Sequence, residues 1–273
     1  MKIITELCQN HNGDINIVKD MVEQAKLGGA DICKIQSIKA DSLTNRSEYE
    51  TFRTYQSEYD RFKELELSYD DEKKFIDFCG QDIIPMTTIF STNDYDYYNS
   101  LGYDYLKLSG YSMEEFNYGL KLDKFDFKHL VFSTSSLTLN EIKKCIDNLK
   151  GVDFTILHCV CLYPTPFEKV NLSSLELLKT LHDNIGFSDH SNNLLISKQA
   201  ILQGINMLEK HFTILNKEKT RDGQVSINPQ ELRELNQFRK YSREQQFRIL
   251  NTFNDKQKFN HTYYKGRFKW LEK

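Results

Sequence analysis

The feature that most constrains the fold is a rhythm of short apolar, β-prone runs, each followed by a helix-prone stretch. Eight such runs occur, at residues 2–7, 31–37, 83–89, 104–109, 129–134, 154–160, 184–188 and 205–211. Strands that alternate with helices form parallel sheets. Eight units in about 250 residues match a (β/α)8 barrel, whereas a doubly wound sheet more often uses about five to seven strands. We therefore predict an α/β chain with a single-domain (β/α)8 TIM barrel.

The stretches between the runs carry helix signals. Residues 15–27 and 69–79 are predicted helices, and Thr138 followed by Glu141 has the pattern of a capping box. The longest connection, residues 38–68, is charged and rich in tyrosine. We expect it to form a helical flap over the mouth of the barrel.

Composition limits the classes of partner. The chain has 36 Lys and Arg residues against 39 Asp and Glu residues, a formal net charge of −3, which favours neither nucleic acid nor an anionic membrane. No run of about 18 apolar residues occurs, and Glu6 interrupts the segment where a signal peptide would be apolar. Six scattered cysteines form no C-x-x-C pair and are interpreted as reduced thiols. We expect a cytoplasmic protein.

The end of the chain differs in charge from the rest. Residues 239–273 contain ten Lys and Arg residues and three Asp and Glu residues, a net charge of +7. We divide the chain into a barrel, residues 1–238, and a short basic C-terminal helix or tail, residues 239–273. A solvated helix and a contact with an oligomer or partner are both open interpretations of this tail.

Polar side chains gather at the C-terminal ends of the predicted strands, where barrels of this kind carry their active sites. They are Glu6, Lys34, Gln36, Thr87, Thr88, Lys107, Ser109, Ser133, Thr134, His158, Ser188, Asp189, His190, Glu209, Lys210 and His211. From these positions alone, we assign Glu209 as a catalytic candidate and Thr88 and Ser109 as substrate-binding candidates.

Two histidines end consecutive strands. His190 and His211 would lie at neighbouring positions around the barrel mouth, and two imidazoles near carboxylates suit a first-row divalent ion. Asp189 and Glu209 adjoin them as candidate partners of that site. The competing interpretation is structural: hydrogen-bonded histidines, with the carboxylates satisfied by Lys210 or by backbone donors.

Two lysines interrupt strands whose neighbours are apolar. Lys34 and Lys107 would be costly to bury unless each meets an anion, which indicates a phosphate or carboxylate ligand. Internal pairing with Glu6 or Glu209 is the alternative.

Five motifs together resemble the sialic acid synthase family, the phosphoenolpyruvate-dependent nonulosonic acid synthases. They are Glu6 followed by QNHNGD (9–14), GGADICKIQ (28–36), LHCVCLYPTP (157–166), FSDHS (187–191) and LEKHFT (208–213). The resemblance spans roughly residues 3–238, and each motif lies at a predicted strand end.

The resemblance implies a role for most of the candidate residues. His190 and His211 would hold a divalent metal, expected to be Mn²⁺. Lys34 and Lys107 would bind phosphoenolpyruvate, and Glu6 matches an essential glutamate. Further anion contacts would come from Gln36, Ser133, Tyr163 and Ser188, and a sugar contact from Asp222.

The implied reaction condenses phosphoenolpyruvate with the aldehyde of a 2-acetamido sugar, giving a nonulosonic acid and phosphate. The resemblance also implies a homodimer. Family members normally continue into an antifreeze-like domain that supplies an arginine to the sugar site, and residues 239–273 are too short for it. We expect that contact to be missing, supplied by a separate capping domain or protein, or replaced by basic residues of the tail.

The sequence departs from the family pattern around the anion site. Gly110 stands at a position where the family has serine, Cys161 where it has asparagine, and Ser135 where it has glycine. Two alternatives therefore stay open: a different metal-dependent barrel aldolase or isomerase, and a weakly catalytic barrel that acts as partner of a full synthase.

Overall fold

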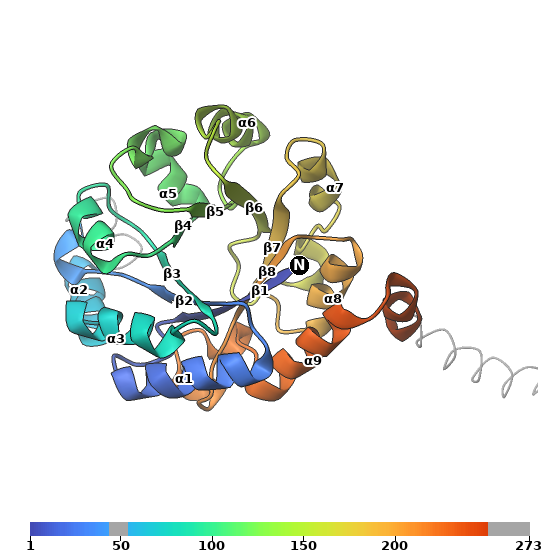
Figure 1. Ribbon diagram of the computed structural model, residues 1–273, viewed down its shortest axis with the longest axis horizontal. Coiled ribbons are helices and arrows are strands. Elements are labelled where there is room, and N and C mark those ends of the chain that lie inside the picture. The colour runs from blue at the N-terminus through green and yellow to red at the C-terminus, as the bar shows by residue number, and fades with distance from the viewer. Residues whose placement is uncertain (44–53, 251–273) are drawn as a thin grey trace, which may run out of the picture.

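The computed structural model describes residues 1–43 and 54–250, and these form a closed barrel of eight parallel strands (Figure 1). The strands are β1 (Lys2–Cys8), β2 (Ile32–Gln36), β3 (Ile84–Thr88), β4 (Tyr105–Leu108), β5 (His129–Ser133), β6 (Phe154–Cys159), β7 (Ile185–Asp189) and β8 (Met207–His211). Each pairs with the next, and β8 pairs with β1. The predicted TIM barrel is confirmed, and every predicted strand agrees with the structure to within two residues at each end.

Helices surround the barrel (Figure 1). They are α1 (Ile15–Gly28), α2 (Tyr55–Leu65), α3 (Tyr69–Cys79), α4 (Tyr95–Leu101), α5 (Gly110–Glu115), α6 (Leu139–Asn148), α7 (Ser174–Lys179), α8 (Leu194–Leu202) and α9 (Pro229–Lys240), with short 3₁₀ turns η1 (Ala40–Ser42), η3 (Asn117–Leu122), η4 (Phe167–Lys169), η5 (Lys217–Lys219) and η6 (Gly223–Val225). The capping box predicted at Thr138 and Glu141 is present at the start of α6. Within the described ranges, no helix combines the length and apolar character of a membrane span.

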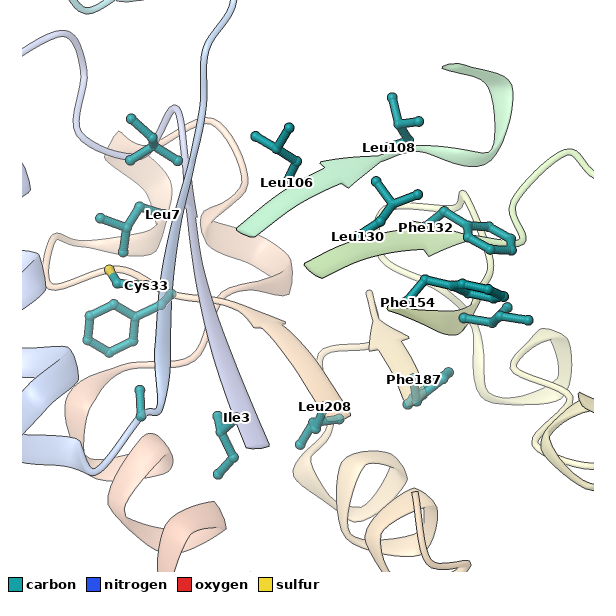
Figure 2. Close-up of a cluster of buried hydrophobic side chains, with 14 of the residues drawn as sticks. Ile3, Leu7, Cys33, Leu106, Leu108, Leu130, Phe132, Phe154, Phe187 and Leu208 are labelled. Carbon is teal, nitrogen blue, oxygen red and sulfur yellow. The ribbon is translucent and has the colours of Figure 1, made fainter. Parts of the chain in front are cut away.

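The apolar core has two layers. The larger lies between the outer face of the strands and the helices, and Figure 2 shows part of it, including Phe132 of β5 and Phe154 of β6, whose ring centroids are 5.9 Å apart. The smaller fills the inside of the barrel and consists of Ile4, Ile32, Met86, Val131, Leu157 and Met207. We call this inner layer the floor.

The inward-facing side chains directly above the floor are mostly polar. Side chains two residues apart on a strand share a face, so the next inward position after each floor residue lies one layer higher, toward the C-terminal mouth. Those positions are Glu6, Lys34, Thr88, Ser133, Cys159 and Glu209. An apolar floor therefore carries a polar layer, and the strand register places Glu6 of β1 beside Lys34 of β2 and His211 of β8.

The long connection after β2 is partly helical, as predicted. Its described part contains η1 and α2, and α2 borders the cavity, which Arg61 and Phe62 help to line. Residues 44–53 of the predicted flap lie outside the described residues.

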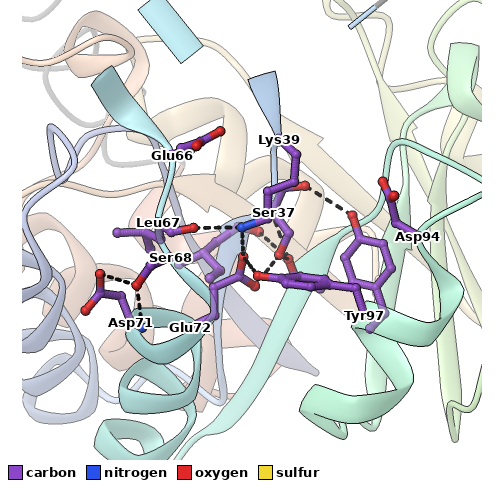
Figure 3. Close-up of polar contacts among 12 residues, drawn as sticks. Ser37, Lys39, Glu66, Leu67, Ser68, Asp71, Glu72, Asp94 and Tyr97 are labelled. Atoms are coloured by element: carbon purple, nitrogen blue, oxygen red, sulfur yellow. Dashed lines mark hydrogen bonds and ion pairs between the residues drawn. The ribbon is translucent and has the colours of Figure 1, made fainter. Parts of the chain in front are cut away.

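A buried carboxylate anchors the start of this connection (Figure 3). Glu72 of α3 accepts hydrogen bonds from Ser37 (2.5 Å), from Tyr97 (2.7 Å) and from Tyr103 (3.3 Å), and Lys39 lies 3.4 Å away. Glu72 is fully buried, so these donors offset the cost of removing its charge from water. The network ties the end of β2 to α3 and α4.

The predicted boundary at residue 238 falls inside α9. The helix continues through Arg239 and Lys240, and Arg239 binds the end of the barrel opposite the mouth. Its guanidinium contacts the Asp31 carboxylate and donates to the carbonyl oxygens of Met1 (3.0 Å) and Gly29 (2.8 Å). Residues 243–250 are again helical, and residues 251–273 of the predicted tail lie outside the described residues.

The Arg239 contacts predict a stability effect that other basic residues near it lack. Arg239→Ala should lower the free energy of unfolding by about 2 kcal/mol, a fall in Tm of roughly 4–8 °C, because it removes charged hydrogen bonds from a partly buried site. Arg248→Ala is the matched control, since Arg248 is 77% exposed and its ion-pair partner among the described residues is the exposed Glu244. Thermal unfolding followed by circular dichroism measures both; equal Tm values for the two variants would contradict the anchoring role.

Candidate active site

One cavity of about 750 Å³ opens at the C-terminal ends of the strands. It is lined by thirteen residues that the sequence singled out for a site role: Glu6, Lys34, Gln36, Thr88, Lys107, Ser109, Ser133, Tyr163, Ser188, His190, Glu209, His211 and Asp222. The structure thus brings these candidates together, with Asp189 as an exception, and their individual roles stay predictions.

Four charged side chains form the lower part of the cavity. Lys34 pairs closely with Glu6, and its Nζ lies 3.5 Å from Oε2 of Glu209. Glu209 also pairs closely with Lys107 and accepts a hydrogen bond from Ser188 at 2.7 Å. The internal pairing weighed from the sequence is therefore what this structure contains, and the cavity reaches all four groups.

Burial and neighbouring charges act in opposite directions on the pKa of Lys34 and on that of Glu209. Burial lowers the pKa of Lys34 to about 7, although the Glu209 carboxylate works against this fall. For Glu209 burial would raise the pKa, but the positive charges of Lys107 and Lys34 outweigh it and hold the pKa well below its usual range. Lys34 can therefore exchange a proton near neutral pH, while Glu209 stays a carboxylate.

The two histidines lie at the mouth, with ring centroids 5.2 Å apart. Nδ1 of His190 donates to the carbonyl oxygen of Val160 at 2.9 Å, so the lone pair is on Nε2, which lies 3.1 Å from the hydroxyl of Tyr163. Nδ1 of His211 is buried and has no hydrogen-bond partner within the described residues.

These imidazoles fit a divalent metal. Burial lowers the pKa of His190 to about 4 and that of His211 well below its usual value, so both rings are neutral at physiological pH. A neutral imidazole with a free lone pair is the form that binds metal. The unpartnered Nδ1 of His211 is the observation that favours a cation over a purely structural role.

Asp189 does not join this site, because its side chain faces away from the cavity. It accepts from the hydroxyl of Ser197 (2.5 Å) and from the backbone N–H of Ser191 (2.8 Å), and Lys210 lies 3.3 Å away. The structural interpretation holds for this carboxylate, whereas Glu209, one residue before Lys210 on β8, points inward.

The serine-rich loops explain one departure from the family pattern. The backbone N–H of Gly110 lies 3.2 Å from Oγ of Ser133 and 3.3 Å from Oγ of Ser135. A Cβ at Gly110 would lie 1.6 Å from the carbonyl oxygen of Ser135, so no serine fits there without moving a backbone. Ser109 instead caps α5 and lines the cavity beside it.

The sequence analysis expected the connection that contains α2 to lie at the mouth, but it did not identify Arg61 as a residue of the cavity. Arg61 of α2 contacts Gln9 at 3.2 Å and Glu58 at 2.5 Å, and its guanidinium stacks on Phe62 at 4.1 Å. The only signal was the charge and tyrosine content of the connection, which did not single out a residue.

Sequence reasoning also missed two residues inside the first motif. Asn10 accepts from the backbone N–H of Asp222 (2.9 Å) and donates to Ser226 (2.9 Å), which fixes the loop that carries Asp222. Cys8 lies at the mouth, in a left-handed backbone conformation with φ of 49°. The Asn10 contacts could not be predicted from the sequence, because Asp222 and Ser226 lie more than 200 residues further along the chain.

Comparisons with known proteins agree with this geometry. The model of the NeuB family matches residues 21–246. The N,N'-diacetyllegionaminic acid synthase of Campylobacter jejuni is 31% identical over 246 residues, covering 85% of this chain and 73% of that protein. The enzyme of the same name from Legionella pneumophila is 32% identical over 253 residues, covering 85% and 69%.

A solved structure supports the fold independently. The N-acetylneuraminic acid (sialic acid) synthetase of Leptospira borgpetersenii superimposes with a TM-score of 0.76 at 23% identity, covering 98% of this chain and 92% of that one. From the family match and these relatives, the chain belongs to the NeuB family and is a barrel enzyme of the nonulosonic acid synthase type.

Proposed function

We propose that this enzyme condenses phosphoenolpyruvate with the aldehyde of a 2-acetamido sugar to give a nonulosonic acid and phosphate. The observation that carries the proposal is one cavity with two buried lysines at its base and two neutral histidines at its mouth. An anionic reactant and a polarised carbonyl can meet across such a cavity.

The base of the cavity supplies the anion site. Lys34 and Lys107 would receive the phosphate and carboxylate of phosphoenolpyruvate, which compete with Glu6 and Glu209 for the same ammonium groups. Gln36, Thr88, Ser109, Ser133 and Ser188 line the surrounding wall and offer hydrogen bonds. A ligand with two anionic groups is favoured, because it can bind both lysines at once.

The mouth supplies the aldehyde site. A divalent cation held by His190 and His211, by resemblance Mn²⁺, would withdraw charge from the aldehyde oxygen as C3 of phosphoenolpyruvate attacks the aldehyde carbon. Tyr163 and Asp222 flank the histidines and would orient the sugar. Because two relatives are named N,N'-diacetyllegionaminic acid synthases, a diacetamido sugar is the first acceptor to test.

Glu6 would act as the base that takes a proton from water. Attack leaves an electron-poor C2 that must gain water before phosphate departs. Glu6 accepts from Lys34 and from the backbone N–H of Cys8 (2.6 Å), so its carboxylate is held at the cavity base, where it can take the proton of that water. Lys34 and Lys107 would hold the departing phosphate.

The family resemblance also implies a homodimer. This is a separate proposal, which light scattering of the purified protein would test.

Binding of phosphoenolpyruvate can be tested without knowing the sugar. At one hundred times its Kd, phosphoenolpyruvate should stabilise the protein by about 2.7 kcal/mol, a rise in Tm of roughly 5–10 °C, with Lys34→Met showing no rise. Phosphate release on adding candidate acceptors then tests condensation. A folded wild-type protein with no rise, with or without Mn²⁺, would contradict the proposal and favour another barrel aldolase or isomerase, or a partner-dependent scaffold.

The low pKa of Lys34 predicts a pH effect on anion binding. With a pKa of about 7, the ammonium form is dominant at pH 6 and a minor species at pH 8, so the Kd for phosphoenolpyruvate should rise up to about tenfold over this range. Lys34→Arg keeps its charge throughout, so its Kd should lack that component. Calorimetric titration of both proteins separates this effect from the ligand's own titration, which they share; identical pH profiles would rule out Lys34 as the titrating contact.

A further inference from the structure

Three side chains with metal-binding chemistry meet on one side of the cavity. Cys8 at the end of β1, His211 at the end of β8 and Asp222 just before η6 each offer a donor atom, and these atoms lie within 4.8 Å of one another. Oδ2 of Asp222 is 3.5 Å from Nδ1 of His211. Thiol, imidazole and carboxylate within this distance of one another can supply three of the four positions of a tetrahedral metal site.

The cluster contains an unsatisfied buried atom. His211 is 4% exposed, and its Nδ1, the atom facing Asp222, has no hydrogen-bond partner within the described residues. An orphaned buried nitrogen costs free energy unless something pairs with it. A cation between the three donors would remove that cost.

Cys8 has a strained backbone conformation. Its φ of 49° is a conformation that glycine adopts freely and cysteine does not, and it lies at a shift in the register between β1 and β2. Strain of this kind persists where the surrounding structure imposes it, often at functional sites. Here it places the thiol at the mouth, against Asp222, rather than in the core.

Hydrogen bonds to its backbone hold Asp222 in position. The backbone N–H of Asp222 donates to Oδ1 of Asn10 at 2.9 Å, and its carbonyl oxygen accepts from Ser226 at 2.7 Å. Asn10 also donates to Phe212, next to His211. These contacts fix the backbone that carries Asp222 and the residue after His211, so the two side chains start from defined positions.

We propose that Cys8, His211 and Asp222 form a three-donor metal site with a cysteine thiolate, in place of the His190 and His211 pair and the Mn²⁺ that the family resemblance implies, and that this site selects Zn²⁺, Co²⁺ or Fe²⁺ over Mn²⁺. His190 then keeps its hydrogen bonds to Val160 and Tyr163. On binding, the thiol proton passes to solvent, and thiolate, carboxylate and divalent ion sum to zero charge. Thiolate is a softer ligand than imidazole or carboxylate and favours these ions. Three protein donors leave a position open for substrate, as catalytic sites require. The catalytic use of this ion rests on the proposed function; its binding does not.

Cobalt provides a direct test, because a cysteine thiolate bound to Co²⁺ absorbs in the near ultraviolet. Titration of the substrate-free protein with Co²⁺ should give this band at one equivalent. Cys8→Gly should fold, since glycine suits the backbone there, but should lose the band and bind Co²⁺ and Zn²⁺ at least about tenfold more weakly. Asp222→Asn should keep the band and weaken binding.

Two other cysteines serve as matched controls. Cys145→Ala removes a buried thiol from α6, away from the cavity, and Cys159→Ala removes one that lines the cavity beside His190. Both should keep the band. A band that survives Cys8→Gly, or that disappears in Cys159→Ala, would overturn the assignment, as would tighter binding of Mn²⁺ than of Zn²⁺. None of these readouts uses phosphoenolpyruvate, so a failure here is distinct from a failure of the proposed reaction.

Discussion

Lys34, held between Glu6 and Glu209, is the interaction on which the rest of the site depends. Its side chain is 1% exposed, and charges taken this far from water are tolerated only when they are paired. Removing one partner leaves an uncompensated charge in the barrel, so the three side chains act as one unit. Under the proposed function, Glu6 and Glu209 hold the lysines in place until an anionic ligand replaces these carboxylates as their partner.

Closure of the barrel is what makes this pairing available. Glu6 lies on the first strand and Glu209 and His211 on the last, yet β1 and β8 are neighbours and Glu6 stands opposite His211. The apolar floor beneath the charges excludes water from below, which strengthens each electrostatic contact above it. A sheet with open edges would leave the first and last strands apart and divide the site.

The cavity has two chemically different sides. Lysines and serines from β2, β4 and β5 form a side suited to anions, and the thiol, imidazoles and carboxylate from β1, β7, β8 and the loop after β8 form a side suited to a cation. In the proposed reaction the two reactants have opposite needs, since the enol phosphate requires positive charge and the sugar aldehyde a Lewis acid. The strand order around the barrel keeps the two environments apart while placing them within one cavity.

The strands, their order and the polar groups at their ends could be predicted from the amino-acid sequence. Alternation of apolar runs with helices is a local property, and a residue such as Lys34 or His190 stands out because its immediate neighbours are apolar. Which polar groups face inward follows from the folded barrel: Glu209 enters the cavity, whereas Asp189 bonds to Ser197. The tertiary structure also placed Cys8 against Asp222 and Arg61 at the wall of the cavity, because those contacts depend on barrel closure, on the register shift in β1 and on the path of a long connection. These are properties of distant segments brought together, and no local pattern encodes them.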